Sequence, residues 1–317
     1  MMRVFVYEHL SGGGAADDAA DELLAAGTQM RDAVVHDLLR AGDCAVSAAI
    51  GPHAAQLPFG ARALRRPPGS SAAEFVAAQA GRHELVWVIA PETGGTLGQL
   101  QRAVDPARWL GCDGAAIALA SSKRATLAHA AEHGVQTPLA FAMSPATRRW
   151  VVKPDDGAGA MHTRVHNTHA AARDDVDSRH ERGEAAVLEA WVAGEPLSLS
   201  LLCSADRIEL LSVNRQQLGI DAFGVLSFTG VQINALPRDD ARFAALRSWA
   251  DTLARSVAGL RGFVGVDLVW HAQRGPVLIE VNPRVTMAYV GLSAALRRNV
   301  ASAVLAAHQR EALHVHA

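Results

Sequence analysis

Two apolar segments toward the carboxyl end of the chain carry polar residues where buried strands are expected. The segment GFVGVDLVW, 262–270, contains Asp267, and VLIEVNPRVT, 277–286, contains Glu280 and Asn282. Because side chains alternate along a strand, Glu280 and Asn282 share one face, and the valines and isoleucine between them occupy the other. A buried carboxylate needs a partner. If the two segments pair as neighbouring strands, the three oxygen-bearing side chains converge.

A cluster of oxygen ligands suits Mg²⁺ better than Zn²⁺, because neither Cys nor His contributes. Asp267, Glu280 and Asn282 are therefore candidate ligands of a magnesium ion. The alternative is a strand end at which Glu280 meets Arg284 or solvent. From these segments alone the two interpretations are equally supported.

Length and charge limit the class of protein. The chain has 317 residues, 50% of them apolar, which is longer than a single core usually grows, so two or three domains are expected. The formal charge is -2, so the composition indicates neither a nucleic-acid surface nor a membrane-binding polycation. No apolar stretch approaches the roughly 20 residues of a membrane span and no signal-peptide pattern is evident, so we expect a cytoplasmic protein.

Lysine is almost absent from the chain. Of the 30 Lys and Arg residues only Lys123 and Lys153 are lysines. If a coding bias favours Arg wherever any positive charge will serve, the remaining lysines mark places that need a compact ammonium, such as a space between phosphate oxygens. The alternative is that two lysines remained by chance, so their surroundings must decide.

Lys153 lies in WVVKPDDGAGAMHTR, 150–164, where a short apolar strand ends at Lys-Pro and a loop with Gly157 and Gly159 follows. Glycine lets backbone amides approach an anion closely, so the loop is a candidate phosphate-binding device. It does not match the Walker P-loop pattern.

Lys123 opens SKRATLAHAAEHG, 122–134, which predicts a helix capped by Ser121 or Ser122 and ending at Gly134. The first turn of a helix favours anions. Further along, AVLEAWVAGEPLSLSLL, 186–202, reads as two strands joined by a polar hinge that could hydrogen-bond a purine edge.

The ordered series of these motifs resembles the ATP-grasp ligase family. The resemblance implies that Lys123 and Lys153 hold nucleotide phosphates and that the loop with Gly157 and Gly159 closes as a lid. It places the hinge and ribose contacts at Glu189, Trp191, Val192 and Glu195, and the metal ligands at Asp267, Glu280 and Asn282. It further implies that Lys153 and Arg284 are catalytic, with ATP as nucleotide and Mg²⁺, or alternatively Mn²⁺, as metal.

The first 110 residues alternate strand-like and helix-like segments, which favours a doubly wound parallel sheet. Gly12, Gly13 and Gly14 follow the first strand, at the edge where such sheets bind ligands. A substrate loop and a loop that needs glycine only for its backbone are about equally supported. The expected fold is α/β: an N-terminal parallel-sheet domain at 1–115, a small α+β lid subdomain at 116–187 and a C-terminal α+β subdomain at 188–317.

Histidine and cysteine do not predict a metal site. HAAEH, 129–133, matches the pattern of inverted zincins, but we expect a solvated helix face. His162, His166 and His169 are irregularly spaced and have no acidic or Cys companion, which favours an exposed cluster. The cysteines Cys44, Cys112 and Cys203 are odd in number and far apart, so we expect reduced packing residues.

The opening VFVYEHLSGGG resembles the start of tyramine–glutamate ligases of methanofuran-type cofactor synthesis. That resemblance implies small-molecule substrates: ATP phosphorylates the glutamate γ-carboxylate and an amine attacks the acyl phosphate. Arg284 or Arg215 is expected to bind the α-carboxylate, although a structural ion pair is as well supported for Arg215. A homodimer is compatible with this interpretation. The alternatives are a ligase or carboxylase for another small acid, and a nucleotide-binding regulatory protein.

Overall fold

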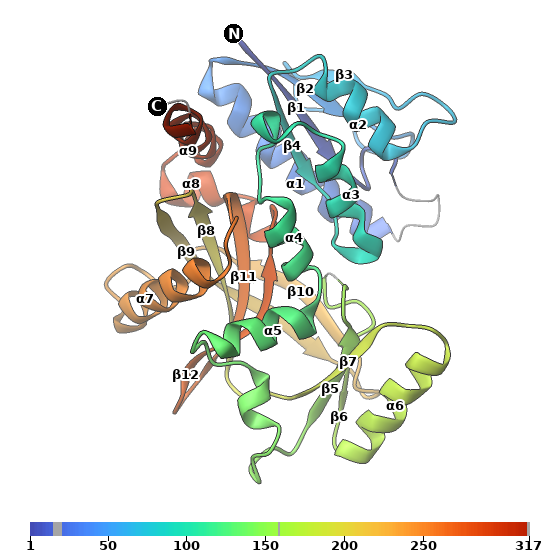
Figure 1. Ribbon diagram of the computed structural model, residues 1–317, viewed down its shortest axis with the longest axis vertical. Helices are drawn as coiled ribbons and strands as arrows, with labels where there is room; N and C mark the ends of the chain where they lie inside the picture. Colours follow the sequence, from blue (N-terminus) through green and yellow to red (C-terminus); the bar gives the residue numbers. More distant parts are fainter. Residues whose placement is uncertain (15–20, 158, 316–317) are drawn as a thin grey trace.

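The computed structural model describes residues 1–14, 21–157 and 159–315. They form three sheets, one parallel and two antiparallel, with helices packed against them (Figure 1). This arrangement confirms the α/β class and the N-terminal parallel sheet predicted from the sequence. Among the helices described, none is long and apolar enough to cross a membrane.

The N-terminal sheet has the strand order β3-β2-β1-β4 and is parallel throughout. β1 (Met2–Glu8) is apolar along most of its length because both of its faces are buried. The other elements here are α1 (Asp21–Ala41), β2 (Cys44–Ala49), β3 (Arg62–Leu64), α2 (Ala72–Ala80), β4 (Leu85–Ile89), η1 (Thr93–Gly95) and α3 (Thr96–Arg102). The chain moves outward from β1 to β3 and then returns to β4 on the other side of β1. The point between β1 and β4 is therefore the switch point at which such sheets bind ligands.

The five-stranded antiparallel sheet has the order β10-β9-β8-β11-β12. Its strands are β8 (Glu195–Cys203), β9 (Ile208–Ile220), β10 (Leu226–Gln232), β11 (Gly262–His271) and β12 (Gly275–Asn282). Along β8, Leu197, Leu199 and Leu201 belong to the core that includes residues of α7 (Ala241–Ser256). Ser198 and Ser200 therefore point to the opposite face, because side chains alternate along a strand. This second face carries the polar side chains of the candidate site.

η2 (Pro106–Arg108) lies against β4 of the N-terminal sheet. The remaining elements of this part are α4 (Gly114–Ala120), α5 (Lys123–Glu132), η3 (Pro138–Phe141), η4 (Met287–Tyr289), α8 (Leu292–Leu296) and α9 (Val300–Val315). The predicted helix at 122–134 is confirmed as α5, and the Ser122 hydroxyl accepts a hydrogen bond from the Ala125 amide at 3.1 Å. α5 packs against β12. We therefore propose that α5 belongs with the five-stranded sheet rather than with a lid that starts at residue 116.

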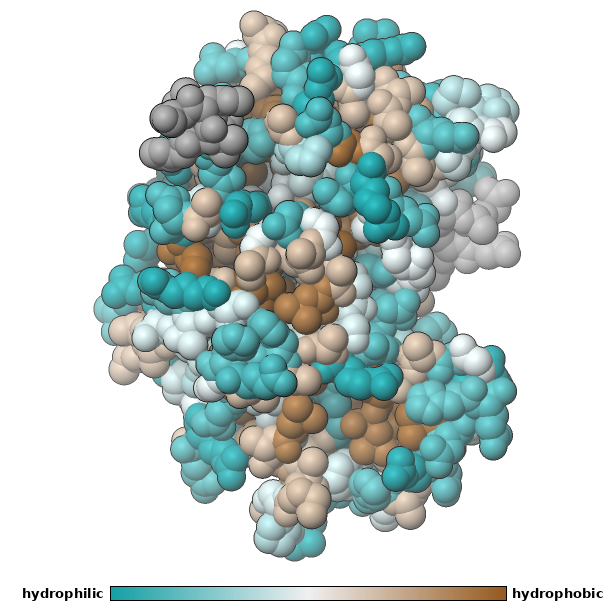
Figure 2. All heavy atoms as spheres, in the orientation of Figure 1, coloured by the Kyte–Doolittle hydropathy of each residue, from teal (hydrophilic) through white to brown (hydrophobic). Residues whose placement is uncertain are grey.

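The smallest sheet has the order β6-β5-β7, with β5 (Trp150–Pro154), β6 (Arg164–His166) and β7 (Ala186–Ala190). α6 (His169–Glu181) covers one face and packs on Val152 and Ala186. The tip of the β9–β10 hairpin reaches this sheet, where the Val165 amide donates to Gly224 O at 2.7 Å. Figure 2 shows the outline of the molecule indented between α6 and the N-terminal part.

Candidate active site

The two acidic strands pair as the sequence suggested. The register of β11 and β12 places Asp267 opposite Glu280 and Gly265 opposite Asn282. The Asn282 side-chain amide donates to Asp267 Oδ2 at 3.3 Å. Burial, together with the neighbouring charge of Glu280, raises the pKa of Asp267 to about 7. Two carboxylates held so close repel each other, and a cation between them would relieve that repulsion.

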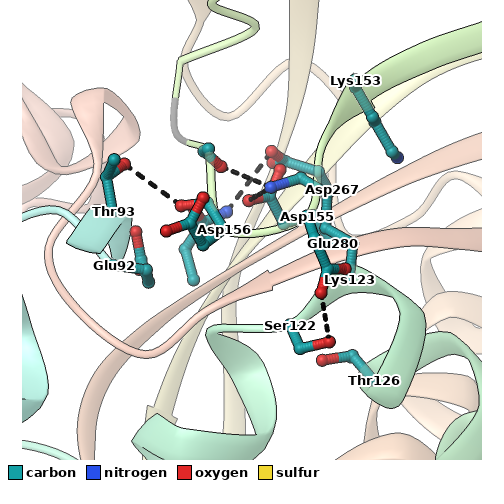
Figure 3. A network of polar contacts seen from close by, with 12 residues as sticks. Glu92, Thr93, Ser122, Lys123, Thr126, Lys153, Asp155, Asp156, Asp267 and Glu280 are labelled. Carbon is teal, nitrogen blue, oxygen red and sulfur yellow. Dashed lines mark hydrogen bonds and ion pairs between the residues drawn. The ribbon is translucent and has the colours of Figure 1, made fainter. Parts of the chain in front are cut away.

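Lys123 supplies one positive charge to this pair. Its Nζ lies 3.1 Å from Glu280 Oε1 and also donates to the carbonyl oxygen of Gly157 in the glycine loop, residues 155–160. The side chain is only 7% exposed, although it starts from the first turn of α5. Figure 3 shows Lys123 beside Glu280 and Asp267, with Asp155 close by.

The glycine loop is fastened to the start of α5 by Asp155. Its carboxylate accepts hydrogen bonds from the Ser122 hydroxyl at 2.7 Å and the Arg124 amide at 2.9 Å, and its carbonyl accepts from the Lys123 amide at 3.0 Å. A carboxylate satisfies the free amides of a helix N-terminus and complements its dipole. The sequence alone did not assign a role to Asp155.

Lys153 lies at the end of β5 and pairs with Glu189 of β7. Lys153 Nζ is 2.9 Å from Glu189 Oε2, and both side chains are buried. The second oxygen, Glu189 Oε1, is buried without a hydrogen-bond partner. A buried acceptor of this kind fits a donor such as the amino group of adenine.

The predicted hinge is the point where the chain passes from the small sheet to the five-stranded sheet. Trp191 lies directly after β7, and the Arg149 guanidinium lies 5.1 Å above its ring centre. Val192 is buried with Phe141 and Val277. The role of this hinge in nucleotide binding stays a prediction.

Glu195 does not join the site. Because side chains alternate along β8, Glu195 shares a face with Leu197, toward α7, whereas Asp267 lies on the other face. Its carboxylate accepts from Arg215 Nε and Arg242 Nη1, each at 2.6 Å. Although burial opposes the charge, these two arginines lower the pKa of Glu195. The structure thus favours a structural role for Glu195 over the expected ribose contact. For Arg215 it favours the ion-pair interpretation over the expected contact with the substrate carboxylate.

Arg284, which follows β12, is held by a residue that the sequence analysis did not identify. Its Nε and Nη2 donate to the two carboxylate oxygens of Glu92 at 3.0 and 2.9 Å. Burial works against the arginine charge, but Glu92, together with the charges of Glu280 and Asp267, raises the pKa of Arg284. Glu92 follows β4 at the carboxyl edge of the parallel sheet, a position that could have marked it as a candidate. Beside it, the Gly94 amide donates to Asp156 Oδ2 at 2.9 Å. The Thr93 hydroxyl donates to Asp156 O at 3.1 Å (Figure 3), and the two bonds tie the glycine loop to the N-terminal part.

The glycine triplet after β1 uses its amides for its own turn. The amides of Gly12, Gly13 and Gly14 donate to Glu8 O, Leu10 O and His9 O at 2.8, 3.1 and 2.8 Å. Gly13 has φ +76°, a conformation that favours glycine. These amides are therefore not free to bind a substrate.

The histidine motifs form no metal site. His129 contacts Ser256 O at 2.8 Å, Glu132 and His133 are exposed, and His166 pairs with Asp175 at 2.8 Å. In the part of the chain that the structure describes, no group of three or more His, Cys, Asp or Glu side chains is arranged around a metal position. Asp267, Glu280 and Asn282 include only two such side chains, because the third is an asparagine. Two carboxylates and an amide oxygen are a donor set that fits Mg²⁺, which normally keeps several waters. The three cysteines are buried and free.

Comparison with known proteins agrees with this geometry. The family model described as "ATP-grasp domain" matches residues 120–288, and the model described as "pre ATP-grasp 3 domain" matches 44–117. The sequence matches none of the curated proteins at a significant level. A crystal structure of a protein assigned to the ATP-grasp superfamily, from Archaeoglobus fulgidus, aligns with TM-score 0.71 and 20% identity over 96% of this chain and 88% of that chain.

Two solved ligases also share the fold. The D-alanine–D-alanine ligase of Bacillus anthracis aligns with TM-score 0.66 and 12% identity over 98% of each chain. The L-amino acid ligase of Bacillus licheniformis aligns with TM-score 0.63 and 14% identity over 93% of this chain and 74% of that chain.

Fold and site together define an α/β protein with one parallel and two antiparallel sheets, in which two buried lysines are each paired with a carboxylate. The first family model covers more than half of the 317 residues. The chain belongs to the ATP-grasp domain family.

Proposed function

We propose that this protein is an ATP-dependent ligase that joins a carboxylate to an amine through an acyl phosphate. The observation that carries the proposal is the position of the two lysines of the chain, both buried and each paired with a carboxylate of the site. Buried ammonium groups paired in this way are fixed before the nucleotide binds. Preorganised positive charge of this kind stabilises the negative charge that develops during phosphoryl transfer.

In the proposed reaction, a carboxylate oxygen of the acid attacks the γ-phosphorus of ATP and ADP leaves. The amine nitrogen then attacks the acyl carbon, the phosphate departs, and a proton is lost from nitrogen. Asp267, Glu280 and Asn282 would hold Mg²⁺ or Mn²⁺, which neutralises phosphate charge when bound. Lys123 and Lys153 would contact the phosphates, and Glu189 with the hinge at Trp191 and Val192 would bind adenine.

The chain itself supplies positioning and exclusion of water. Asp155 fixes the glycine loop to α5, and Asp156 fixes it to the turn at Gly94, so the loop covers Lys123. Such a cover protects an acyl phosphate from hydrolysis. Arg284, which is held by Glu92, would stabilise charge on the departing phosphate.

For the substrates we propose the γ-carboxylate of glutamate and an aromatic amine such as tyramine, as in methanofuran-type cofactor synthesis. The opening VFVYEHLSGGG supports this choice. The test is ADP release with glutamate and tyramine, each alone and together, followed by mass spectrometry. A γ-glutamyl amide that forms only with both supports the assignment. Product from a different acid and amine would retain the ligase and reject this substrate pair, whereas no ATP-dependent amide from any pair would reject the ligase.

A further inference from the structure

Three buried polar groups without hydrogen-bond partners in the residues described gather beside the glycine triplet. They are the Tyr7 hydroxyl, His9 Nδ1 and Arg66 Nε. A buried polar group without a partner costs the free energy of the hydrogen bonds that it gives up to water. Several of them in one place indicate a site that is completed by something besides the chain.

The groups come together because of the geometry of β1 and the turn after it. Tyr7 and His9 share one face of the chain, and their ring centres are 6.3 Å apart. A Cβ atom built on Gly14 would lie 2.4 Å from both the Tyr7 hydroxyl and His9 Nδ1, so both atoms face the same point. Arg66 joins them from the segment after β3, where its Nη2 donates to Gly13 O at 2.7 Å. Among the residues that the structure describes, the backbone of Gly14 lies directly against the Tyr7 hydroxyl and the His9 ring.

The chemistry of these groups favours an anion. Burial raises the pKa of Tyr7 well above its ordinary value, so the hydroxyl keeps its proton and can donate. Burial and the charge of Arg66 lower the pKa of His9, so the imidazole is neutral at pH 7 and can donate through one nitrogen. Arg66 carries the positive charge. The nearest carboxylate, Glu8, is already engaged by the amides of Leu10 and Ser11 at 3.2 and 2.7 Å.

The location suits a substrate rather than the nucleotide. The cluster lies at the switch point between β1 and β4, where the His9 amide donates to Ile89 O at 2.8 Å. From Ile89 the chain runs directly to Glu92, which binds Arg284 at the edge of the site. The two arginines expected from the sequence to bind the substrate α-carboxylate, Arg215 and Arg284, are each already paired with a glutamate.

We propose that Tyr7, His9 and Arg66 form the binding site for the α-carboxylate of the amino-acid substrate, beneath the turn of Gly12 to Gly14. This inference rests on the proposed function for the nature of the substrate. Binding requires a shift of the glycine turn, because the polar atoms have no direct exposure to solvent in the ligand-free protein. Ser11 lies in the same turn and would move with it.

The experiment uses the full-length protein without ATP and measures its melting temperature with each of the twenty common amino acids, with inorganic phosphate and with tyramine. Tyr7→Phe and Arg66→Gln are compared with Arg65→Gln, which alters the exposed neighbouring arginine. We expect an amino acid, with glutamate first, to raise the melting temperature of the wild type and of Arg65→Gln. In Tyr7→Phe and Arg66→Gln the increase is lost. Ligand-free Tyr7→Phe melts at or above the wild-type temperature, because the lost hydroxyl had no partner.

Steady-state kinetics gives a second readout. The KM for the amino acid should rise about tenfold or more in Tyr7→Phe and Arg66→Gln, since each loses a hydrogen bond to a charged group, and the KM for ATP should change less than about twofold. An unchanged KM for the amino acid, a melting temperature raised by phosphate alone, or no increase with any amino acid would each overturn the proposal. An amino-acid effect that Tyr7→Phe abolishes, in a protein that forms no amide from any pair, would keep this site and reject the ligase.

Discussion

Arg284 and Glu92 lie 192 residues apart in the chain and form a two-point ion pair, with N–O distances of 3.0 and 2.9 Å. The pair joins the loop after β12 to the end of β4, so it connects the strand end beside the proposed magnesium ligands to the carboxyl edge of the parallel sheet. Both side chains are largely buried, Glu92 being 3% exposed.

We predict that Glu92→Gln lowers both stability and turnover. Removing one partner of a buried pair leaves the other charge uncompensated, which costs about 3–5 kcal/mol. The measurements are urea unfolding and the kcat for ADP release. Glu184→Gln, which alters the exposed pair with Arg182, is the matched control and should change stability by less than about 1 kcal/mol. Equal effects of the two variants would show that the Arg284–Glu92 pair has no special role.

Lys123→Arg and Lys153→Arg are each expected to lose about 2–4 kcal/mol of transition-state stabilisation while keeping the charge. The ammonium of Lys123 fits between Glu280 Oε1 and Gly157 O, where a planar guanidinium is too wide. The measurement is kcat/KM for ATP. Arg124→Lys is the control, since only the Arg124 amide takes part in the site, and it should retain activity. Near-native kcat/KM in both lysine variants would contradict the phosphate assignment.

Asp267→Asn should stabilise the metal-free protein and weaken metal binding. The folded-state pKa of Asp267, about 7, lies above its ordinary value of 3.8. Protonated Asp267 therefore contributes its full stabilisation of the folded protein below about pH 4, and this contribution is lost as the pH rises toward 7. The neutral amide avoids that loss, so the rise in melting temperature in EDTA should be larger at pH 8 than at pH 5. Mn²⁺ binding followed by electron paramagnetic resonance should weaken in the same variant. A lower melting temperature at pH 8 would count against repulsion between Asp267 and Glu280.

The variants Glu189→Gln and Glu195→Gln distinguish the glutamate proposed to bind adenine from the glutamate that has a structural role. Glu189 has one unpaired buried oxygen and faces Lys153, so its variant should raise the Kd for ADP about tenfold or more. Glu195 is paired with Arg215 and Arg242 on the other face of β8, so its variant should leave the Kd near wild type and lower stability modestly. Isothermal titration with ADP and thermal melting measure the two effects. A large loss of ADP affinity in Glu195→Gln would restore the ribose role.

The sequence by itself determined the local parts of this protein. The apolar runs predicted β11, β12 and the parallel sheet, and Ser122 with Gly134 predicted the limits of α5. The alternation of a strand placed Glu280 and Asn282 on one face. The scarcity of lysine indicated Lys123 and Lys153 as candidate site residues, and the side chains of both are buried at the site. All of these depend on side-chain periodicity, capping and composition, which a short segment expresses without its neighbours.

Contacts between distant segments were decided only by the tertiary structure. Nothing near Arg284 in the sequence indicates that Glu92 binds it, and nothing near Tyr7 indicates that Arg66 completes the polar cluster above it. Glu195 shows the same limit, because its position beside the hinge suggested a ribose contact, whereas one residue of strand register turns it toward α7 and two arginines. The physical reason is that charges and unpaired polar groups are satisfied by whatever packing brings within hydrogen-bond distance, and that packing is a property of the whole chain.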